Sequence, residues 1–228
     1  MGSPVESTRF SYEASLKYLH QLTMSQDLRL ETNIPKQMIT AWSPGGEKQF
    51  DFRLPLPCPP LPETPGKLAI YTANLPEAPP PYVMALVQAG AAALGYFEEG
   101  EVVAHKAIKK YMKRQKQGKA QINYLNTRGK SKAGSRIRLA NTITFFEEIN
   151  ERLSDWEKKH PPQRILYSCT ARLWGMIFQS KVTPPFTKKD PRLVRIPRDV
   201  HIPCHEELLR IDELCRSGWL YPAEQPEK

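Results

Sequence analysis

The first half of the chain shows short apolar stretches that are typical of β-strands. Tyr82–Gln88, Ala91–Glu98 and Glu101–Ile108 follow one another closely, and Glu99-Gly100 favours a hairpin turn because glycine tolerates a positive φ. The apolar run Lys67–Leu75 indicates a further buried strand before them. Together these stretches predict a β-meander.

The second half of the chain has a helical period. From Ser135 onward, apolar residues recur every three or four positions until His160-Pro161-Pro162 ends the helix, and they are Leu139, Ile143, Phe146, Ile149, Leu153 and Trp156. The pattern then predicts a strand over Arg164–Cys169, a helix over Thr170–Phe178, a short strand over Leu193–Ile196 and a helix over Cys204–Cys215. This order predicts an α/β (α+β) fold, a mixed sheet flanked by helices, which is similar to the ribonuclease H-like arrangement.

The first 66 residues have a different character. A short helix is expected after Ser11, with Leu16, Leu19 and Leu22 along one side. Six prolines between Pro55 and Pro65 forbid a helix and favour polyproline II structure. We therefore expect an extended N-terminal arm and Pro-rich strap over residues 1–66, a globular domain over 67–216 and a tail over 217–228.

Positive charge is concentrated in one segment. The chain has 33 Lys and Arg against 24 Asp and Glu, a net charge of +9. Between His105 and Arg138 there are twelve basic residues and no acidic ones, which leaves 21 basic and 24 acidic residues elsewhere. Such a local field attracts polyanions, most often the phosphates of nucleic acids.

The centre of this segment has the composition of a functional loop. Residues 115–135 are polar and lack periodicity, and long loops of this kind in compact domains usually carry function or are disordered. The expected phosphate-binding residues flank the loop or lie in it, and they are His105, Lys106, Lys109, Lys110, Lys113, Arg114, Lys116, Lys119, Arg128, Lys130, Lys132, Arg136 and Arg138. Tyr111 and Tyr124 are candidates for stacking on a base or for partial burial beneath the loop.

Gln121 is the candidate catalytic residue. It ends the turn Gly118-Lys119-Ala120-Gln121 at the centre of the basic segment. A neutral amide both donates and accepts hydrogen bonds, so it can hold a water molecule against an ester carbonyl without a tuned pKa. The alternative is an ordinary polar surface residue, like Gln115 and Gln117 nearby.

Other classes of site receive less support from the sequence. Cys58, Cys169, Cys204 and Cys215 show no CxxC spacing, which is typical of free thiols in a reducing compartment. His201, Cys204 and His205 lack a matching Cys or His pair, so no metal site is expected, and no organic cofactor is implied. The chain shows no secretory signal and no membrane span, and we expect a cytoplasmic monomer.

One family resemblance is carried by residues of the basic segment. His105-Lys106, Tyr111, Arg114, Gly118-x-x-Gln121, Ala133-Gly134, Arg138 and Asn141 follow one another in the order and spacing of a family motif. In this motif the chain resembles the Vms-like release-factor family, relatives of the catalytic domain of the eukaryotic class-one translation termination factor. The resemblance is clearest over residues 67–180. Where the termination factors have Gly-Gly-Gln, this chain has Lys119-Ala120-Gln121, which enters positive φ less freely.

The resemblance implies a ribonuclease H-like catalytic domain over residues 67–216 that works on the large ribosomal subunit. Its loop would enter the peptidyl-transferase centre, where Gly118 opens the loop and Gln121 positions water for hydrolysis of peptidyl-tRNA. The basic residues would face phosphates of tRNA or ribosomal RNA. Two alternatives stay open, a non-catalytic factor that only binds rRNA or tRNA and an endonuclease that cuts tRNA near its 3′ end.

Overall fold

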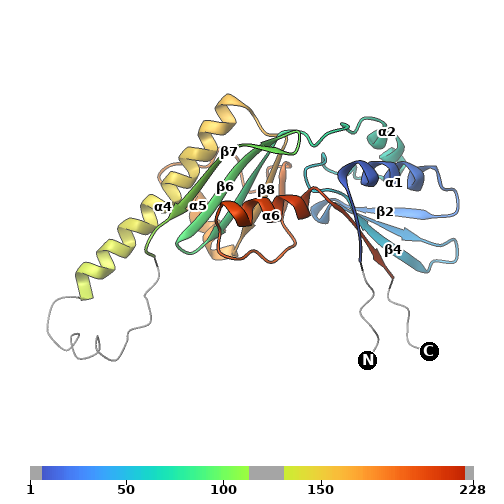
Figure 1. Ribbon diagram of the computed structural model, residues 1–228. Helices are drawn as coiled ribbons and strands as arrows, with labels where there is room; N and C mark the ends of the chain where they lie inside the picture. Colours follow the sequence, from blue (N-terminus) through green and yellow to red (C-terminus); the bar gives the residue numbers. More distant parts are fainter. Residues whose placement is uncertain (1–6, 113–130, 224–228) are drawn as a thin grey trace.

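Two five-stranded sheets form the framework of the protein, as a computed structural model shows (Figure 1). The structure describes residues 7–112 and 131–223, with the side chains of 131–136 and 138 excepted. The strand order of the first sheet is β1 (Thr8–Phe10), β10 (Gly218–Pro222), β4 (Lys48–Arg53), β3 (Met38–Trp42) and β2 (Arg29–Asn33). The order of the second is β7 (Glu101–Lys109), β6 (Ala91–Glu98), β5 (Tyr82–Gln88), β8 (Arg164–Cys169) and β9 (Leu193–Arg195).

The second sheet is mixed and buried on both faces. β5, β6 and β7 pair antiparallel, whereas β8 and β9 join the sheet in parallel. Alternate residues of β5 enter different clusters, with Val83 packing on one face and Met84 on the other. Burial on both faces explains the continuous apolar sequence of β5. The mixed α/β class expected from the sequence is confirmed, as is the hairpin at Glu99-Gly100, where both residues have positive φ.

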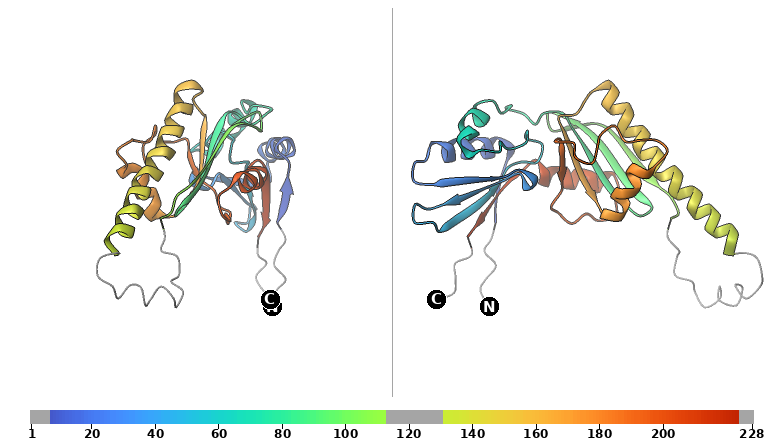
Figure 2. Two further views of the ribbon diagram at one scale, coloured as in Figure 1. Left: turned by 60° about the vertical axis from the view of Figure 1, so that its left-hand side comes forward. Right: turned by 180° about the vertical axis from the view of Figure 1, so that it is seen from behind.

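Helices cover the two faces of the second sheet. α4 (Ser131–Lys159) and α5 (Ala171–Gln179) pack on the face that carries Val83, and α6 (His205–Cys215) packs on the face that carries Met84. Each of the two shorter helices begins at a side-chain cap, Thr170 for α5 and Cys204 for α6. Figure 2 shows that the N-terminal part of α4 projects beyond the sheet.

The residues expected to form an extended N-terminal arm and a C-terminal tail instead form the first sheet. Residues of the arm supply β1 to β4 and the helix α1 (Tyr12–Met24), and residues of the tail supply β10, which lies between β1 and β4. The Ser11 cap of α1 is confirmed, because its hydroxyl accepts a hydrogen bond from the Ala14 amide. Leu19 and Phe52 are fully buried between α1 and the sheet, so these segments have a core of their own. The Pro-rich residues 54–64 form neither helix nor strand.

The strand expected over Lys67–Leu75 is wrong, because this segment forms the turn η2 (Pro65–Lys67) and the helix α2 (Leu68–Ala73). Leu68, Tyr71 and Leu75 contact the core of the first sheet, whereas Ile70 is exposed. Contacts three and four residues apart belong to a helix. The run is too short for its composition alone to distinguish the two structures.

A buried arginine joins the two sheets. Arg164 begins β8 and is 2% exposed. Its guanidinium donates to the backbone oxygens of Leu56 and Pro191, both at 3.3 Å, and to Gln37 Oε1 at 3.4 Å. Gln37 is itself fully buried and donates from Nε2 to the oxygens of Cys58 and Pro59. Burial lowers the pKa of Arg164 to about 10, so the group stays charged at neutral pH.

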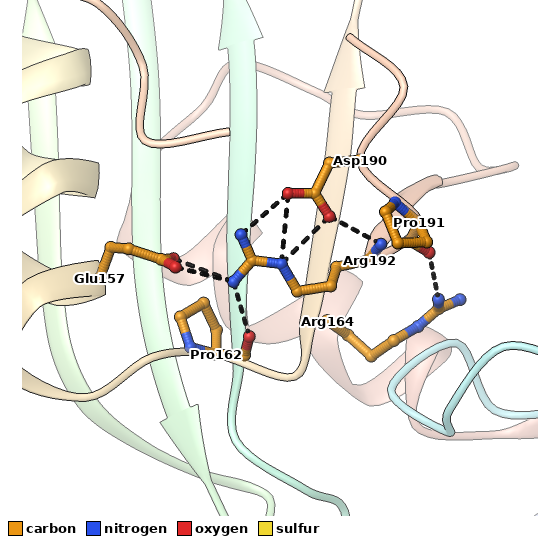
Figure 3. Close-up of polar contacts among 6 residues, drawn as sticks. All are labelled: Glu157, Pro162, Arg164, Asp190, Pro191 and Arg192. Atoms are coloured by element: carbon orange, nitrogen blue, oxygen red, sulfur yellow. Dashed lines mark hydrogen bonds and ion pairs between the residues drawn. The ribbon is translucent and has the colours of Figure 1, made fainter. Parts of the chain in front are cut away.

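A second arginine ties the C-terminal end of α4 to the loop before β9 (Figure 3). Arg192 Nη1 lies 2.9 Å from Glu157 of α4, and its Nη2 lies 2.9 Å from Asp190. Nη1 also donates to the oxygen of Pro162 at 3.1 Å. These contacts close the corner at which the chain leaves α4 and enters β8. They fix the end of α4 that lies opposite the basic segment.

We expect Arg164→Met to lower the free energy of unfolding by about 3 kcal/mol, because it leaves three acceptors without their donor. The exposed Arg172 of α5 provides the matched control, and Arg172→Met should change stability by less than about 0.5 kcal/mol. Urea unfolding of both variants measures the difference. Equal stability of the two variants would show that Arg164 does not hold the junction.

Asp212 is a buried carboxylate at the same junction. Its Oδ1 accepts a hydrogen bond from the Tyr82 hydroxyl, and its Oδ2 lies 2.8 Å from Arg216 Nε. Burial raises the pKa of Asp212 to about 6, against the opposing effects of the Tyr82 hydrogen bond and the Arg216 charge. The folded protein therefore holds a proton on this group that the unfolded chain releases near pH 4.

The stability that Asp212 contributes is complete below about pH 4 and should decline as the pH rises through about 6. Asp212→Asn has no such titration. The free energy of unfolding of the wild type minus that of Asp212→Asn should therefore fall by roughly 2–3 kcal/mol between pH 4 and pH 7. Chemical denaturation at a series of pH values measures this difference, and a flat difference would contradict the raised pKa.

Candidate nucleic-acid interface

The basic segment connects β7 to α4. β7 ends at Lys109 and α4 begins at Ser131, and both ends lie at the same end of the molecule (Figure 1). The expected loop 115–135 ends earlier than predicted, since residues 131–135 belong to the helix. Both candidate catalytic residues, Gly118 and Gln121, lie outside the described residues. So do six of the expected phosphate ligands, Lys113, Arg114, Lys116, Lys119, Arg128 and Lys130.

Four basic residues lie on β7 or directly after it. They divide between the two faces of this edge strand. Ile108 packs beneath α4, and strand alternation places Lys106 and Lys110 on that face. His105 and Lys109 lie on the α6 face. The sequence suggested that these residues flank one loop tip together. Instead, the structure separates them into two pairs, and all but Lys110 are exposed.

Three contacts fix the point at which the chain leaves β7. The Lys110 amide donates to the oxygen of Gly90 at 2.9 Å, and the Lys110 ammonium lies 2.6 Å from Glu148 of α4. Asn141 of α4 donates from Nδ2 to the oxygen of Tyr111 at 3.1 Å. Asn141 belongs to the family motif, and this hydrogen bond gives it a positioning role. The exit of the segment is therefore fixed to the helix that follows it.

α4 changes character along its length. Phe146, Ile149, Leu153 and Trp156 are buried against the second sheet, as their spacing predicted. Leu139 and Ile143, predicted on the same apolar face, are 63% and 42% exposed. Figure 2 shows that the second sheet does not extend beneath this part of the helix, which fits the exposure of the two side chains. Lys132, Arg136 and Arg138 lie in this projecting part.

A second histidine lies beside His105. The His105 and His205 rings stack with their centroids 4.0 Å apart, and Nδ1 of His205 is buried without a hydrogen-bond partner among the described residues. His205 is the first residue of α6, 100 positions from His105. No local sequence signal connects the two, because their contact depends on how α6 packs on the sheet.

The remaining candidates from the sequence have structural roles. Cys204 caps α6 by accepting a hydrogen bond from the Glu207 amide, and His201 lies 3.4 Å from the Glu207 carboxylate. Burial raises the pKa of the Cys169 thiol to about 12, as fits a structural cysteine.

Comparison with known families identifies the class. A family model described as the Bacteroidetes VLRF1 release factor matches residues 82–217, more than half of the chain. The matched range contains the second sheet, the helices that cover it and the basic segment, which places the chain among release factors. The protein belongs to the Bacteroidetes VLRF1 release factor family, and the resemblance to Vms-like release factors is confirmed.

Two curated relatives extend this family. The chain is 29% identical to the tRNA endonuclease ANKZF1 of Mus musculus over 151 residues, and 28% identical to that of Homo sapiens over 154 residues. The alignments cover 64% and 65% of this chain but only 20% and 21% of the relatives. A solved structure of the Vms1 mitochondrial localization core aligns over 96% of this chain and 97% of its own, with a TM-score of 0.49 and 14% identity.

Among the described residues, no helix combines the length and apolar character that a bilayer span requires. The same residues contain no cluster of three or more His, Cys, Asp or Glu side chains arranged for a metal ion.

Gly90 should be required for the path by which the chain leaves β7. It has φ +88°, and a Cβ at this position would lie 2.6 Å from the oxygen of Lys110. Gly46 has φ +83° with nothing near its Cβ position, so Gly46→Ala isolates the backbone cost of about 1 kcal/mol. Gly90→Ala should cost at least about 1 kcal/mol more in free energy of unfolding because of the clash. Equal costs in denaturant titrations would contradict this account.

Proposed function

We propose that this protein releases stalled nascent chains by hydrolysing the ester of peptidyl-tRNA on the large ribosomal subunit. The observation that carries the proposal is the place of Gly118-x-x-Gln121 in the sequence, between the described elements β7 and α4. The segment joins two rigid elements, β7 and α4, in a chain of a release-factor family. Water is the nucleophile in this mechanism, and Gln121 positions it and stabilises the transition state by hydrogen bonds.

The scaffold supports placement of the segment against RNA. The Gly90, Glu148 and Asn141 contacts fix the end of β7, where the segment begins, to β6 and to α4, so the segment has a defined origin. The first turn of α4 contains no acidic residue. Its helix dipole and the nearby cations Lys132, Arg136 and Arg138 favour an anion at this end of the molecule.

The basic residues are proposed to bind phosphates of tRNA and ribosomal RNA. His105 and Lys109 on one face of β7, with Lys106 on the other, would contact RNA on both sides of the edge strand. Lys110 contributes less, because it is already paired with Glu148. The interface is completed by the basic residues between β7 and α4 and by those in the first turns of α4. The former are Lys113, Arg114, Lys116, Lys119, Arg128 and Lys130, and the latter are Lys132, Arg136 and Arg138.

A tRNA 3′-end endonuclease is the second candidate function. The curated relatives are named tRNA endonucleases, and the stacked His105 and His205 rings bring two titratable groups to the α6 face of β7. Strand cleavage needs an acid and a base near the phosphodiester. In this alternative His105 and His205 would supply them, and Gln121 would be secondary. A non-catalytic rRNA- or tRNA-binding factor is the third possibility.

Gln121→Ala should slow peptide release by roughly 10- to 1000-fold, the effect expected when a group that positions a reactant is removed. Binding and thermal stability should be nearly unchanged, because the change removes one amide. Purified large subunits carrying peptidyl-tRNA are incubated with each variant, and both products are sized. Gln115→Ala and Gln117→Ala are the matched controls and should release peptide at the wild-type rate.

The tRNA product separates the alternatives. An intact 3′ end supports ester hydrolysis. A shortened 3′ end that disappears in His105→Gln but persists in Gln121→Ala would replace our proposal with the endonuclease. Release at the wild-type rate by Gln121→Ala would contradict the glutamine mechanism. No release above the rate without protein, by the wild type or by any variant, with tRNA left intact, would favour the binding factor.

A further inference from the structure

A basic cavity lies where the two sheets meet, away from the segment proposed for catalysis. Its volume is about 640 Å³. Lys36 and Arg53 line it from the first sheet and its η1 turn (Ile34–Lys36), whereas Arg195 and Arg198 line it from β9 and the chain that follows. Asp199 is the one acidic residue in the lining. The cavity therefore has a surplus of positive charge.

The cations of the cavity are not neutralised by the protein. Within residues 7–112 and 131–223, none of the four forms an ion pair, although other arginines such as Arg192 and Arg216 do so. Arg53 Nε and Arg198 Nη2 are buried without any hydrogen-bond partner among the described residues. Buried donors are rarely left unpaired in proteins, and the described residues supply no acceptor for either of these two.

Strand β10 holds two of these arginines in place. The Arg198 guanidinium carbon lies 3.8 Å from the centroid of the Trp219 ring. Arg53 lies over the Tyr221 ring at 5.2 Å and donates from Nη1 to the Tyr221 hydroxyl at 2.9 Å. Stacking on an aromatic ring holds the plane of a guanidinium in place, and a guanidinium binds phosphate through its N–H groups. The arginines are thus ordered before any ligand binds, which reduces the entropic cost of binding.

We propose that this cavity is a second RNA-binding site, which takes backbone phosphates between Arg53, Arg195 and Arg198. β9 and β7 are the opposite edges of a five-stranded sheet. At the usual strand spacing, the site lies about 19 Å or more from the strand that leads into the basic segment. A single RNA that contacts both sites would be bound at two points, which raises its affinity without any new contact at the loop. The inference concerns binding alone and does not depend on the release reaction.

The test is the affinity of the full chain for a short fluorescein-labelled single-stranded RNA, measured by anisotropy over a series of salt concentrations. Arg195 is exposed at the end of β9, so Arg195→Glu should fold normally. It should weaken binding about tenfold at low salt, equivalent to about 1.4 kcal/mol. The slope of log affinity against log salt should become shallower by about 0.7 for each phosphate that the variant no longer binds.

Arg172→Glu is the matched control, because it reverses an exposed arginine of α5 outside the cavity. It should change affinity less than twofold. Arg198→Gln, checked for normal folding by circular dichroism, should weaken binding in the same direction as Arg195→Glu. If Arg195→Glu and Arg172→Glu change the RNA affinity equally, the proposal is overturned. Water would then be the hydrogen-bond partner of the buried donors.

Unlabelled pyrophosphate distinguishes RNA from a small free anion. Displacement of the RNA by pyrophosphate in the wild type, with weaker displacement in Arg195→Glu, supports a phosphate site that RNA occupies. Pyrophosphate binding is also measured by calorimetry. If Arg195→Glu abolishes pyrophosphate binding but leaves the RNA affinity unchanged, the RNA assignment is overturned.

Discussion

The arrangement of this protein depends on one buried charge. Arg164 lies at the start of β8 and bonds to Gln37, which directly precedes β3 of the first sheet, and to Leu56 of the strap that follows β4. Removing a guanidinium from water is costly, and its lowered pKa measures part of that cost. Three carbonyl-type acceptors offset it, and among the described residues no carboxylate pairs with Arg164. The two sheets are therefore held by a directional contact rather than by apolar packing alone.

The second sheet was largely predictable because its signals are local. The strands β5 and β6 are buried on both faces, so their apolar sequences are continuous, and a two-residue turn links β6 to β7. The first sheet was missed because its order depends on distant pairing. β10 lies between β1 and β4, and Leu220 faces both Thr8 and Phe52 across more than 160 positions of sequence. Strands of three to six residues carry too little local periodicity to predict such a sheet.

The candidate site was predictable in composition but not in geometry. Charge counting locates the basic segment, since only one stretch of the chain carries the surplus. The residues that anchor it act through tertiary contacts, such as the amide of Asn141 on the oxygen of Tyr111. The cavity between the sheets is harder still to anticipate. Arg53 and Arg198 are far apart in the sequence, and both contact aromatic residues of β10, Tyr221 for Arg53 and Trp219 for Arg198.

The electrostatics of the described residues favour positioning over acid–base chemistry. Catalytic acids and bases usually show strongly shifted pKa values within a cleft. In this protein the carboxylate whose pKa is raised to about 6, Asp212, lies buried beneath α6. The Tyr82 hydroxyl, whose pKa is also raised, bonds to it there. A neutral amide such as Gln121 needs no shifted pKa and requires only a rigid support. The end of β7, held by Gly90 and by Glu148 and Asn141 of α4, provides that support, which is why we prefer ester hydrolysis to strand cleavage.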